Sequence, residues 1–525
     1  MHIHKQTEDN KNGDNMAFFS KKAKLRVSDP VTAGDSVPGS ELSASLSENL
    51  SVIKELFGES FDLVVKHSEV CSVRIAFVAL DGMYNGLHAS QAVVEPAVET
   101  DAVLTTGAAV YEHICSFRAS ECDSKDAQTL AEAVNYILSG CMVLFVDGEA
   151  RCRAFSVQGF PRRPVQQPDS EAQENGSREG FADMYKDNVT LVRRRLKSPY
   201  VRFEVLTVGA TGNNPVVVCY HSGRADMQLV ERVKECIKGA ELDFVCGAGA
   251  LRPFLEKRRL SFFSAVGSTE RPDVFSAKIA EGRVGIIADG TPHALVVPYL
   301  FAENFHTLDD YLNRPYYATV TRILKIICFL LAVFLPGTYV AVGTFHQEIF
   351  PSAVLSDVVA SLMNTPFPLA TECLIIHFIY EIVREAGLRM PGVVGHTVSI
   401  VGALVIGDAA VSAKLISAPM LIIVALTAIC SAVVPSLHQP TSVLRLIFII
   451  LGGTMGLYGI MLGFSFVLTD ICSKESFGVP FSAPLSPLDL YAARDTVLFA
   501  GWRNTGKRVF LINKLRGRKK NENKG

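Results

Sequence analysis

Four long stretches without an acidic or basic residue lie close together in the second half of the chain, and they constrain its fold more than any other feature. A helix that spans a membrane needs roughly 17 to 25 predominantly apolar residues. The stretches that pass this test are residues 326–345, 390–407, 415–444 (one span, ending near Pro435) and 446–469. A soluble core would not hold four such segments so close together, so we predict an all-α polytopic membrane domain over residues 313–472.

Residues 350–389, between the first two spans, are partly apolar but carry Glu372, His377 and Glu381. Charges in a lipid-facing helix are costly, so this piece is expected to lie in the interface or to face a wet or protein-lined interior. The tail over residues 473–525 is basic, and the polar N-terminus offers no signal peptide. The positive-inside rule then places both termini in the cytoplasm. An even number of spans follows: four plus a re-entrant or interfacial segment, with six as the alternative.

The first 312 residues have the character of a soluble α/β region. After a disordered lead-in (1–41), an amphipathic helix over residues 42–61 precedes apolar strands at 73–80 and 142–146, each of which runs into an Asp-Gly turn signal. Similar strands at 216–220 and 284–288 run into Gly223 and Gly290, 141 and 142 residues after Gly82 and Gly148. This repeat predicts two tandem related α/β subdomains, at residues 42–165 and 199–312.

A polar linker and a basic helix over residues 166–198 separate the two predicted subdomains. The helix carries a cluster of four basic residues, Arg193, Arg194, Arg195 and Lys197. Two interpretations stay open for this cluster: a solvated helix face, or a contact with lipid head groups or with the acidic face of a partner.

The span around residues 393–413 has one side that is small and weakly polar, with Ser399 and Gly402 on it, and titratable groups, His396 and Asp408, towards its ends. Small residues favour close helix packing in lipid, but a small, weakly polar face also suits an ion path. Composition alone favours helix packing over an ion path for this span. In the last span, the small residues are spaced for packing against a neighbouring helix or another subunit: Gly452, Gly456, Gly459 and Gly463.

Several function classes are excluded by composition and spacing. The net charge of −2 gives no basic field for nucleic acid. None of the twelve cysteines forms a CxxC pair, so no zinc site or redox motif is expected, and the cysteines suit a reducing compartment. The sequence GWRNTGKR at 501–508 has Arg where a phosphate-binding loop needs Ser or Thr. We therefore expect no enzyme activity, no metal and no cofactor.

A set of short motifs resembles the A subunit of the GerA family of spore germinant receptors. In chain order the motifs are SREGF (177–181), TLVRRRLKSP (190–199), RFE (202–204), ERPD (270–273), EGRV (281–284), DGTP (289–292), YVAVGTFH (339–346), REAG (384–387), VSIVGALVIG (398–407) and SFGVP (476–480). Together they extend the resemblance over about residues 42–490.

The resemblance implies a multi-pass protein in the inner membrane of a bacterial endospore. It also implies that the chain acts together with a transporter-like B subunit and a lipoprotein C subunit. It further implies that the chain assembles into a homo-oligomer, a pentamer, which forms an ion channel. This channel would open on nutrient sensing and release monovalent cations. On this basis pore lining becomes the preferred interpretation of residues 393–413. The family more often has Gln where this chain has His396 and Asp408, so conductance, selectivity or pH response is expected to differ.

Three alternatives remain. An accessory paralogue of the stage V sporulation protein AF type would share the same domains. A non-conducting membrane signalling scaffold would use the spans only as anchors, and it predicts that changes at Gly402 or Asp408 leave function intact. A secondary transporter should show inverted repeats and broken helices at the midplane, and no such repeat is detectable in the sequence.

Overall fold

The structure is a computed structural model, and it describes a large part of the chain. The described residues are 39–95, 104–117, 123–159, 171, 176–256, 261–351, 360, 365–390, 405, 407–486, 488, 495–499, 501 and 512–515.

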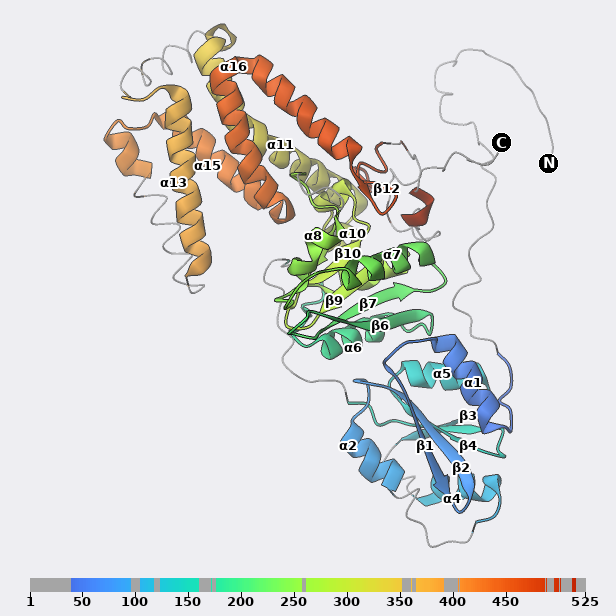
Figure 1. Ribbon diagram of the computed structural model, residues 1–525. Helices are drawn as coiled ribbons and strands as arrows, with labels where there is room; N and C mark the ends of the chain where they lie inside the picture. Colours follow the sequence, from blue (N-terminus) through green and yellow to red (C-terminus); the bar gives the residue numbers. More distant parts are fainter. Residues whose placement is uncertain are drawn as a thin grey trace, which may run out of the picture. The chain divides into compact units, whose positions relative to one another are not determined.

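The first α/β unit is built on a five-stranded antiparallel sheet with the order β1-β2-β4-β5-β3 (Figure 1). Its strands are β1 (Leu63–Val70), β2 (Val73–Leu80), β3 (Ser124–Ala127), β4 (Met142–Val146) and β5 (Cys152–Phe155). Its helices are α1 (Leu46–Phe57), α2 (Gly86–Ala89), η1 (Ser90–Val94), α4 (Gly107–Phe117) and α5 (Leu130–Leu138).

The second α/β unit repeats this topology, with the strand order β6-β7-β9-β10-β8. Its strands are β6 (Val201–Val208), β7 (Asn214–His221), β8 (Gly267–Thr269), β9 (Val284–Ala288) and β10 (Ala294–Val297). Its helices are α6 (Tyr185–Arg195), α7 (Met227–Lys238), η2 (Ala248–Leu251), α8 (Arg252–Leu255) and α9 (Pro272–Ala280). The predicted fold class, two related α/β subdomains followed by a helical region, is confirmed.

The two units also share hydrogen bonds that dock their first helix. In the first unit, Asp147 Oδ1 accepts a bond from the Leu46 amide at the start of α1 (3.1 Å). In the second, Asp289 Oδ1 accepts one from the Tyr185 amide at the start of α6 (3.2 Å). Each carboxylate belongs to an Asp-Gly turn that joins two antiparallel strands, β4 to β5 and β9 to β10. Asp81-Gly82 differs from these two turns, because β2 is followed by α2 and not by a hairpin partner.

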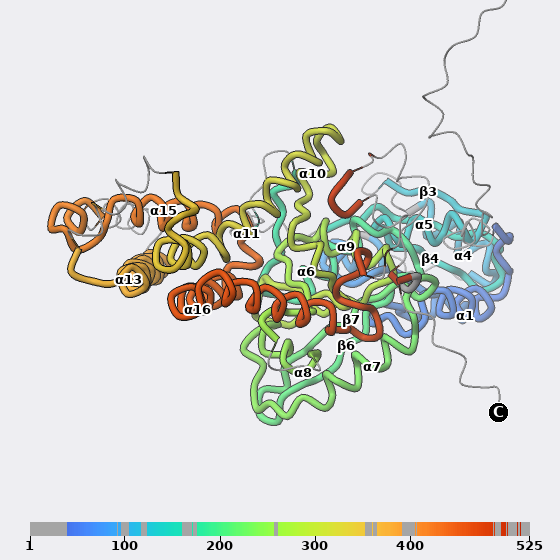
Figure 2. The backbone as a smooth tube through the Cα atoms, turned by 90° about the horizontal axis from the view of Figure 1, so that it is seen from above, coloured from blue at the N-terminus to red at the C-terminus, as the bar shows by residue number. Residues whose placement is uncertain are grey.

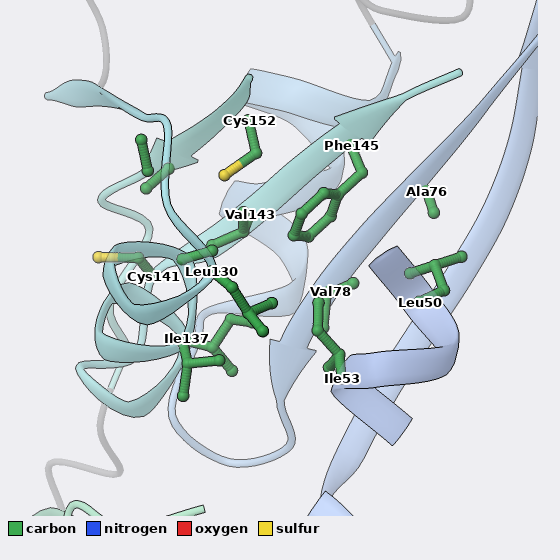
Figure 3. Close-up of a cluster of buried hydrophobic side chains, with 14 of the residues drawn as sticks. Leu50, Ile53, Ala76, Val78, Leu130, Ile137, Cys141, Val143, Phe145 and Cys152 are labelled. Carbon is green, nitrogen blue, oxygen red and sulfur yellow. The ribbon is translucent and has the colours of Figure 1, made fainter. Parts of the chain in front are cut away.

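Strand alternation divides the first unit into two hydrophobic layers. Ala76, Val78 and Leu80 of β2 join α1 and α5 on one face, whereas Ile75 and Phe77 join α4 on the other. Figure 3 shows the first layer, where Leu50 and Ile53 of α1 and Ile137 of α5 surround Val78 and Phe145. Period-two alternation in β2 therefore serves two helix layers, which is why the strand reads as a continuous apolar run.

The helical region contains α11 (Pro315–Phe345), α13 (Leu369–Arg389), α15 (Ala418–Ala432) and α16 (His438–Ser473). Among the described residues, two helical segments are long and apolar enough to cross a membrane, Pro315–Phe345 and Pro435–Ser473. Most of the expected span 390–407 lies outside the described residues. The stretch 415–444 is divided between α15, which has 15 residues, and the start of α16.

The predicted span over residues 446–469 lies within α16, which bends at Gly456, whose φ of 63° and ψ of −147° are not helical. A Cβ on Gly463 would lie 2.6 Å from a ring atom of Phe448, so the two arms of α16 are in contact after the bend. Phe334 of α11 packs on Phe448 and on Phe464, one from each arm (4.6 and 5.6 Å between ring centroids). Figure 2 shows α16 beside α11. Only glycine adopts this backbone conformation without strain.

Short segments join the second α/β unit to α11: η3 (Phe301–Phe305) and α10 (Leu308–Leu312). His306 is half-buried here, and its Nε2 lies 2.7 Å from the Thr496 carbonyl oxygen. Burial, assisted by the nearby Arg322 guanidinium, lowers the pKa of His306 to about 4. The imidazole is therefore neutral at neutral pH and donates its Nε2 hydrogen to that carbonyl.

A buried ion pair fixes α6 to the first α/β unit. The Arg193 guanidinium binds both carboxylate oxygens of Asp62 (2.9 and 3.0 Å), and each side chain is at most 2% exposed. The remaining donors of Arg193 reach Ser60 Oγ and the carbonyls of Ser198 and Val201. This pair is thus fully hydrogen-bonded away from water.

We predict that Arg193→Met lowers the free energy of unfolding of the full chain by about 3–5 kcal/mol, because it leaves the Asp62 carboxylate buried without a counter-charge. Lys186→Met is the matched control: Lys186 also binds an aspartate of the first unit, Asp81, but both groups are largely exposed (47% and 39%). The control should cost roughly 0–1 kcal/mol. Denaturant unfolding in detergent, followed by circular dichroism, measures both; equal losses would contradict the prediction.

A second prediction concerns pH. Because the pKa of His306 is depressed in the folded chain, the unfolded chain binds the extra proton between about pH 6.5 and 4. Stability should fall over this window as the pH is lowered, by about 3 kcal/mol at most from this group. His306→Gln, which still donates a hydrogen bond but does not titrate, should flatten the profile, whereas the same change at exposed His67 should not. Melting temperatures across this pH range test the difference.

Candidate functional site

Titratable side chains are buried where the four apolar helices meet. Glu372 lies in the first turn of α13 and is fully buried. Its Oε1 accepts two short hydrogen bonds, from the amide and the hydroxyl of Ser417 (2.6 Å each). Ser417 is the N-cap residue of α15, so the glutamate joins α13 to the start of α15. Its other oxygen, Oε2, has no hydrogen-bond partner among the described residues.

One turn further along α13, His377 is also buried. Its Nδ1 lies 2.9 Å from the carbonyl oxygen of Cys373, so Nδ1 carries a hydrogen and donates it to this carbonyl. Nε2 is buried and, within the described part of the chain, finds no partner. This nitrogen is therefore a free acceptor inside the helical region.

Arg445 is buried in the first arm of α16, and its position depends on a proline in α11. Pro336 lacks the N–H that would bond the carbonyl of Ala332 four residues earlier. Arg445 Nε donates to that carbonyl instead, at 3.0 Å. The guanidinium also lies 5.9 Å from the ring centroid of Tyr380 on α13. Its two Nη atoms are buried, and no described residue accepts a bond from them.

An acid, an imidazole and a guanidinium thus lie buried within the helical region, on α13 and α16. Buried charges at membrane depth are costly and mark ion paths, proton relays or coupling sites. Sequence reasoning noticed Glu372 and His377 only as exceptions in an apolar stretch, and it missed Arg445. The signal for Arg445 was available, because this residue is the sole charge between the uncharged stretches 415–444 and 446–469.

Among the predicted ion-path residues, Asp408 lies within the described part of the chain. His396, Ser399 and Gly402 lie outside the described residues. Asp408 lies in the helical residues 407–412, and its side chain is exposed. The ion-path interpretation of the 393–413 span therefore stays a prediction.

The predicted packing glycines lie at close contacts within the chain. A Cβ on Gly452 would come 2.3 Å from the Gly337 carbonyl oxygen, so the backbones of α11 and α16 touch here. A Cβ on Gly459 would come 2.5 Å from the Leu451 carbonyl oxygen, across the bend at Gly456. Gly463 meets Phe448, as described above. These glycines allow backbone contacts that a side chain would block.

The basic cluster divides into an internal and an external part. Arg193, expected with its neighbours to contact solvent, lipid or a partner, is instead inside the molecule with Asp62. Arg194 and Arg195 both bind Glu179, at 3.1 and 2.6 Å. Lys197 is exposed. The sequence could not distinguish these positions because Asp62 is 131 residues away from Arg193.

Comparisons with known proteins identify relatives over nearly the whole chain. Residues 51–510 match the family model described as Bacillus/Clostridium GerA spore germination protein. Spore germination protein KA of Bacillus subtilis (strain 168) is 33% identical over 478 residues, which cover 90% of this chain and 88% of that protein. The uncharacterized membrane protein YfkQ of the same organism is 32% identical over 91% of this chain and 93% of its own length. The crystal structure of the N-terminal domain of the A subunit of the Bacillus megaterium spore germinant receptor GerK3 aligns with a TM-score of 0.41 and 26% identity, covering 50% of this chain and 99% of that one.

The Gly337–Gly452 contact leads to a third prediction. Gly452→Ala should lower the free energy of unfolding by about 1–3 kcal/mol, because the added methyl group forces α11 and α16 apart. Exposed Thr454→Ala, on the same helix, is the matched control and should change stability by less than about 0.5 kcal/mol. Thermal unfolding of the detergent-purified chain measures both, and an unaltered melting temperature in Gly452→Ala would show that the helices are not in backbone contact.

Proposed function

The chain belongs to the GerA family of spore germination proteins, and we propose that it is the A subunit of a nutrient germinant receptor. In this proposal it lies in the inner membrane of the spore as a multi-pass protein, with both termini in the cytoplasm. It forms an oligomeric, nutrient-gated channel that releases monovalent cations, and no catalytic step or cofactor is assigned to it.

The family match carries the proposal because it includes both parts of the chain. Residues 51–510 take in the two α/β units as well as α11, α13, α15 and α16. The relatives have names that fit this role: spore germination protein KA, and proteins B1 and A1 of the same organism. A chain that aligns over its soluble and its helical parts is expected to share the role of the whole relative.

The helical region supports a role in the membrane. Two of its segments meet the length and composition requirement for a span. Buried Glu372 and His377 of α13 and Arg445 of α16 give the helical region polar groups in its interior, which an ion-conducting protein needs and a simple anchor does not.

Partners follow from the same proposal. The channel would be a homo-oligomer, a pentamer, that works with a transporter-like B subunit and a lipoprotein C subunit. Nutrient binding at a partner would shift the helices between a closed and an open state. Exposed Lys197 remains available for lipid head groups or a partner surface.

Potassium release from spores of the host, after addition of nutrient, tests this function. Gly402→Leu adds bulk and Asp408→Ala removes a charge in the 393–413 span, and each is expected to block release or to cause release without nutrient. Glu385→Ala is the matched control, because this glutamate of α13 is exposed (52%) and pairs with exposed Arg389. The variants are compared at equal protein levels in the spore membrane.

The control should release potassium as the wild type does. If Gly402→Leu and Asp408→Ala also behave as wild type, the span serves packing, and the scaffold or the accessory paralogue becomes the better interpretation. Loss of release in all three variants would point to an assembly defect and would contradict a specific role of the 393–413 span.

A further inference from the structure

The buried carboxylate of Glu372 has chemistry that the ion-channel proposal does not yet use. We propose that Glu372 Oε2 binds a single monovalent cation in the interior of each subunit, where α11, α13 and α15 meet. The inference rests on the proposed membrane role and adds a defined binding site to it, within the protomer and apart from the 393–413 span.

The surroundings of one oxygen of Glu372 favour negative charge at this position. Oε1 accepts from both the amide and the hydroxyl of Ser417, each at 2.6 Å. O–H···O distances in this range are typical of a charged acceptor, and two donors on one oxygen stabilise negative charge. The start of α15 adds the positive end of a helix dipole at the same place. The site is therefore built to hold a carboxylate anion.

No described side chain supplies the counter-charge. Oε2 is buried and has no partner among the described residues. The buried guanidinium of Arg445 donates to the Ala332 carbonyl of α11 and lies near the ring of Tyr380, and that of Arg322 pairs with Asp310 and Asp495. His377 on the same helix uses its single hydrogen on Cys373. An uncompensated buried charge is strongly unfavourable, so a small cation at Oε2 would restore neutrality.

The surroundings favour a monovalent ion. One carboxylate neutralises one positive charge, and the described residues contain no group of three or more His, Cys, Asp or Glu able to hold a metal ion. Ca²⁺ needs six to eight oxygen ligands and usually several carboxylates. Tyr339 of α11 packs on the cluster that contains Cys373, the residue after Glu372, and its hydroxyl is buried and, among described residues, unpartnered. It is a neutral oxygen suited to share such an ion.

Binding of ⁸⁶Rb⁺ to the purified full chain in detergent, measured by scintillation proximity, tests the site. Wild type should bind one Rb⁺ per chain, and excess K⁺ should displace it. Glu372→Gln keeps the shape and the acceptor for Ser417 but removes the charge, and its affinity for Rb⁺ should fall at least about tenfold. Glu385→Gln, the same change at an exposed position of the same helix, should bind as wild type.

Equal affinity in wild type and a folded Glu372→Gln would overturn the proposal. The absence of Rb⁺ binding to folded wild type would also overturn it. If Glu372→Gln does not fold, a measurement on the wild type tests the proposal. The infrared difference spectrum of the wild type between Rb⁺ and N-methylglucamine solutions should show a shifted carboxylate band. The absence of a shift would overturn the proposed site. Equilibrium binding of Rb⁺ can be measured whether or not the protein conducts ions, so this test is independent of the proposed channel function. If Rb⁺ binds at Glu372 but potassium release is unaltered in the Gly402→Leu and Asp408→Ala variants, the cation site is supported and the channel function of the 393–413 span is not.

Discussion

The contact between α11 and α16 organises the helical region. Gly337 and Gly452 bring the two backbones together so closely that neither position has room for a methyl group. One residue before Gly337, Pro336 leaves the Ala332 carbonyl without its helical donor, and Arg445 of α16 takes that place. The same contact therefore fixes the helix spacing and explains why a charged residue lies in an apolar interior. The bend at Gly456 then returns the second arm of α16 to Phe334 of α11.

The base of α11 connects this helix pair to the second α/β unit. Asp310 of α10 binds Lys325 (3.0 Å) and Arg322 (3.4 Å) of α11, and Arg322 also binds Asp495 (2.9 Å). An aromatic cluster lies beside these ion pairs, with Phe301 in contact with Phe263, Phe305 and Phe329. Segments from the second unit, the first apolar helix and the C-terminal part thus share one packed junction. Displacement of the second unit would act directly on α11, which is the connection that gating by a partner requires.

The sequence predicted the fold class because its signals are local. Apolar runs and Asp-Gly turns identified the strands, and the offset of 142 between Gly148 and Gly290 matches the equivalent turns of the two sheets. The sites depend instead on distant pairs: Arg193 with Asp62, and Glu372 with Ser417, 131 and 45 residues apart. Periodicity shows that a charge interrupts an apolar face, but not which residue meets it. The bend at Gly456 was missed for a similar reason, since four glycines at helical spacing also suit a straight packed helix.

The polar groups of the helical region are difficult to explain by stability alone. Replacing buried charges by apolar residues of similar volume is often neutral or stabilising, so a chain selected only for anchoring would gain by losing them. Arg445 has a structural reason, the carbonyl freed by Pro336, although this uses only one of its donors. Glu372 binds Ser417 through one oxygen, yet an uncharged side chain could accept the same two bonds. Packing therefore leaves the acidic side chain unexplained, and the proposed cation site would give a reason to keep it.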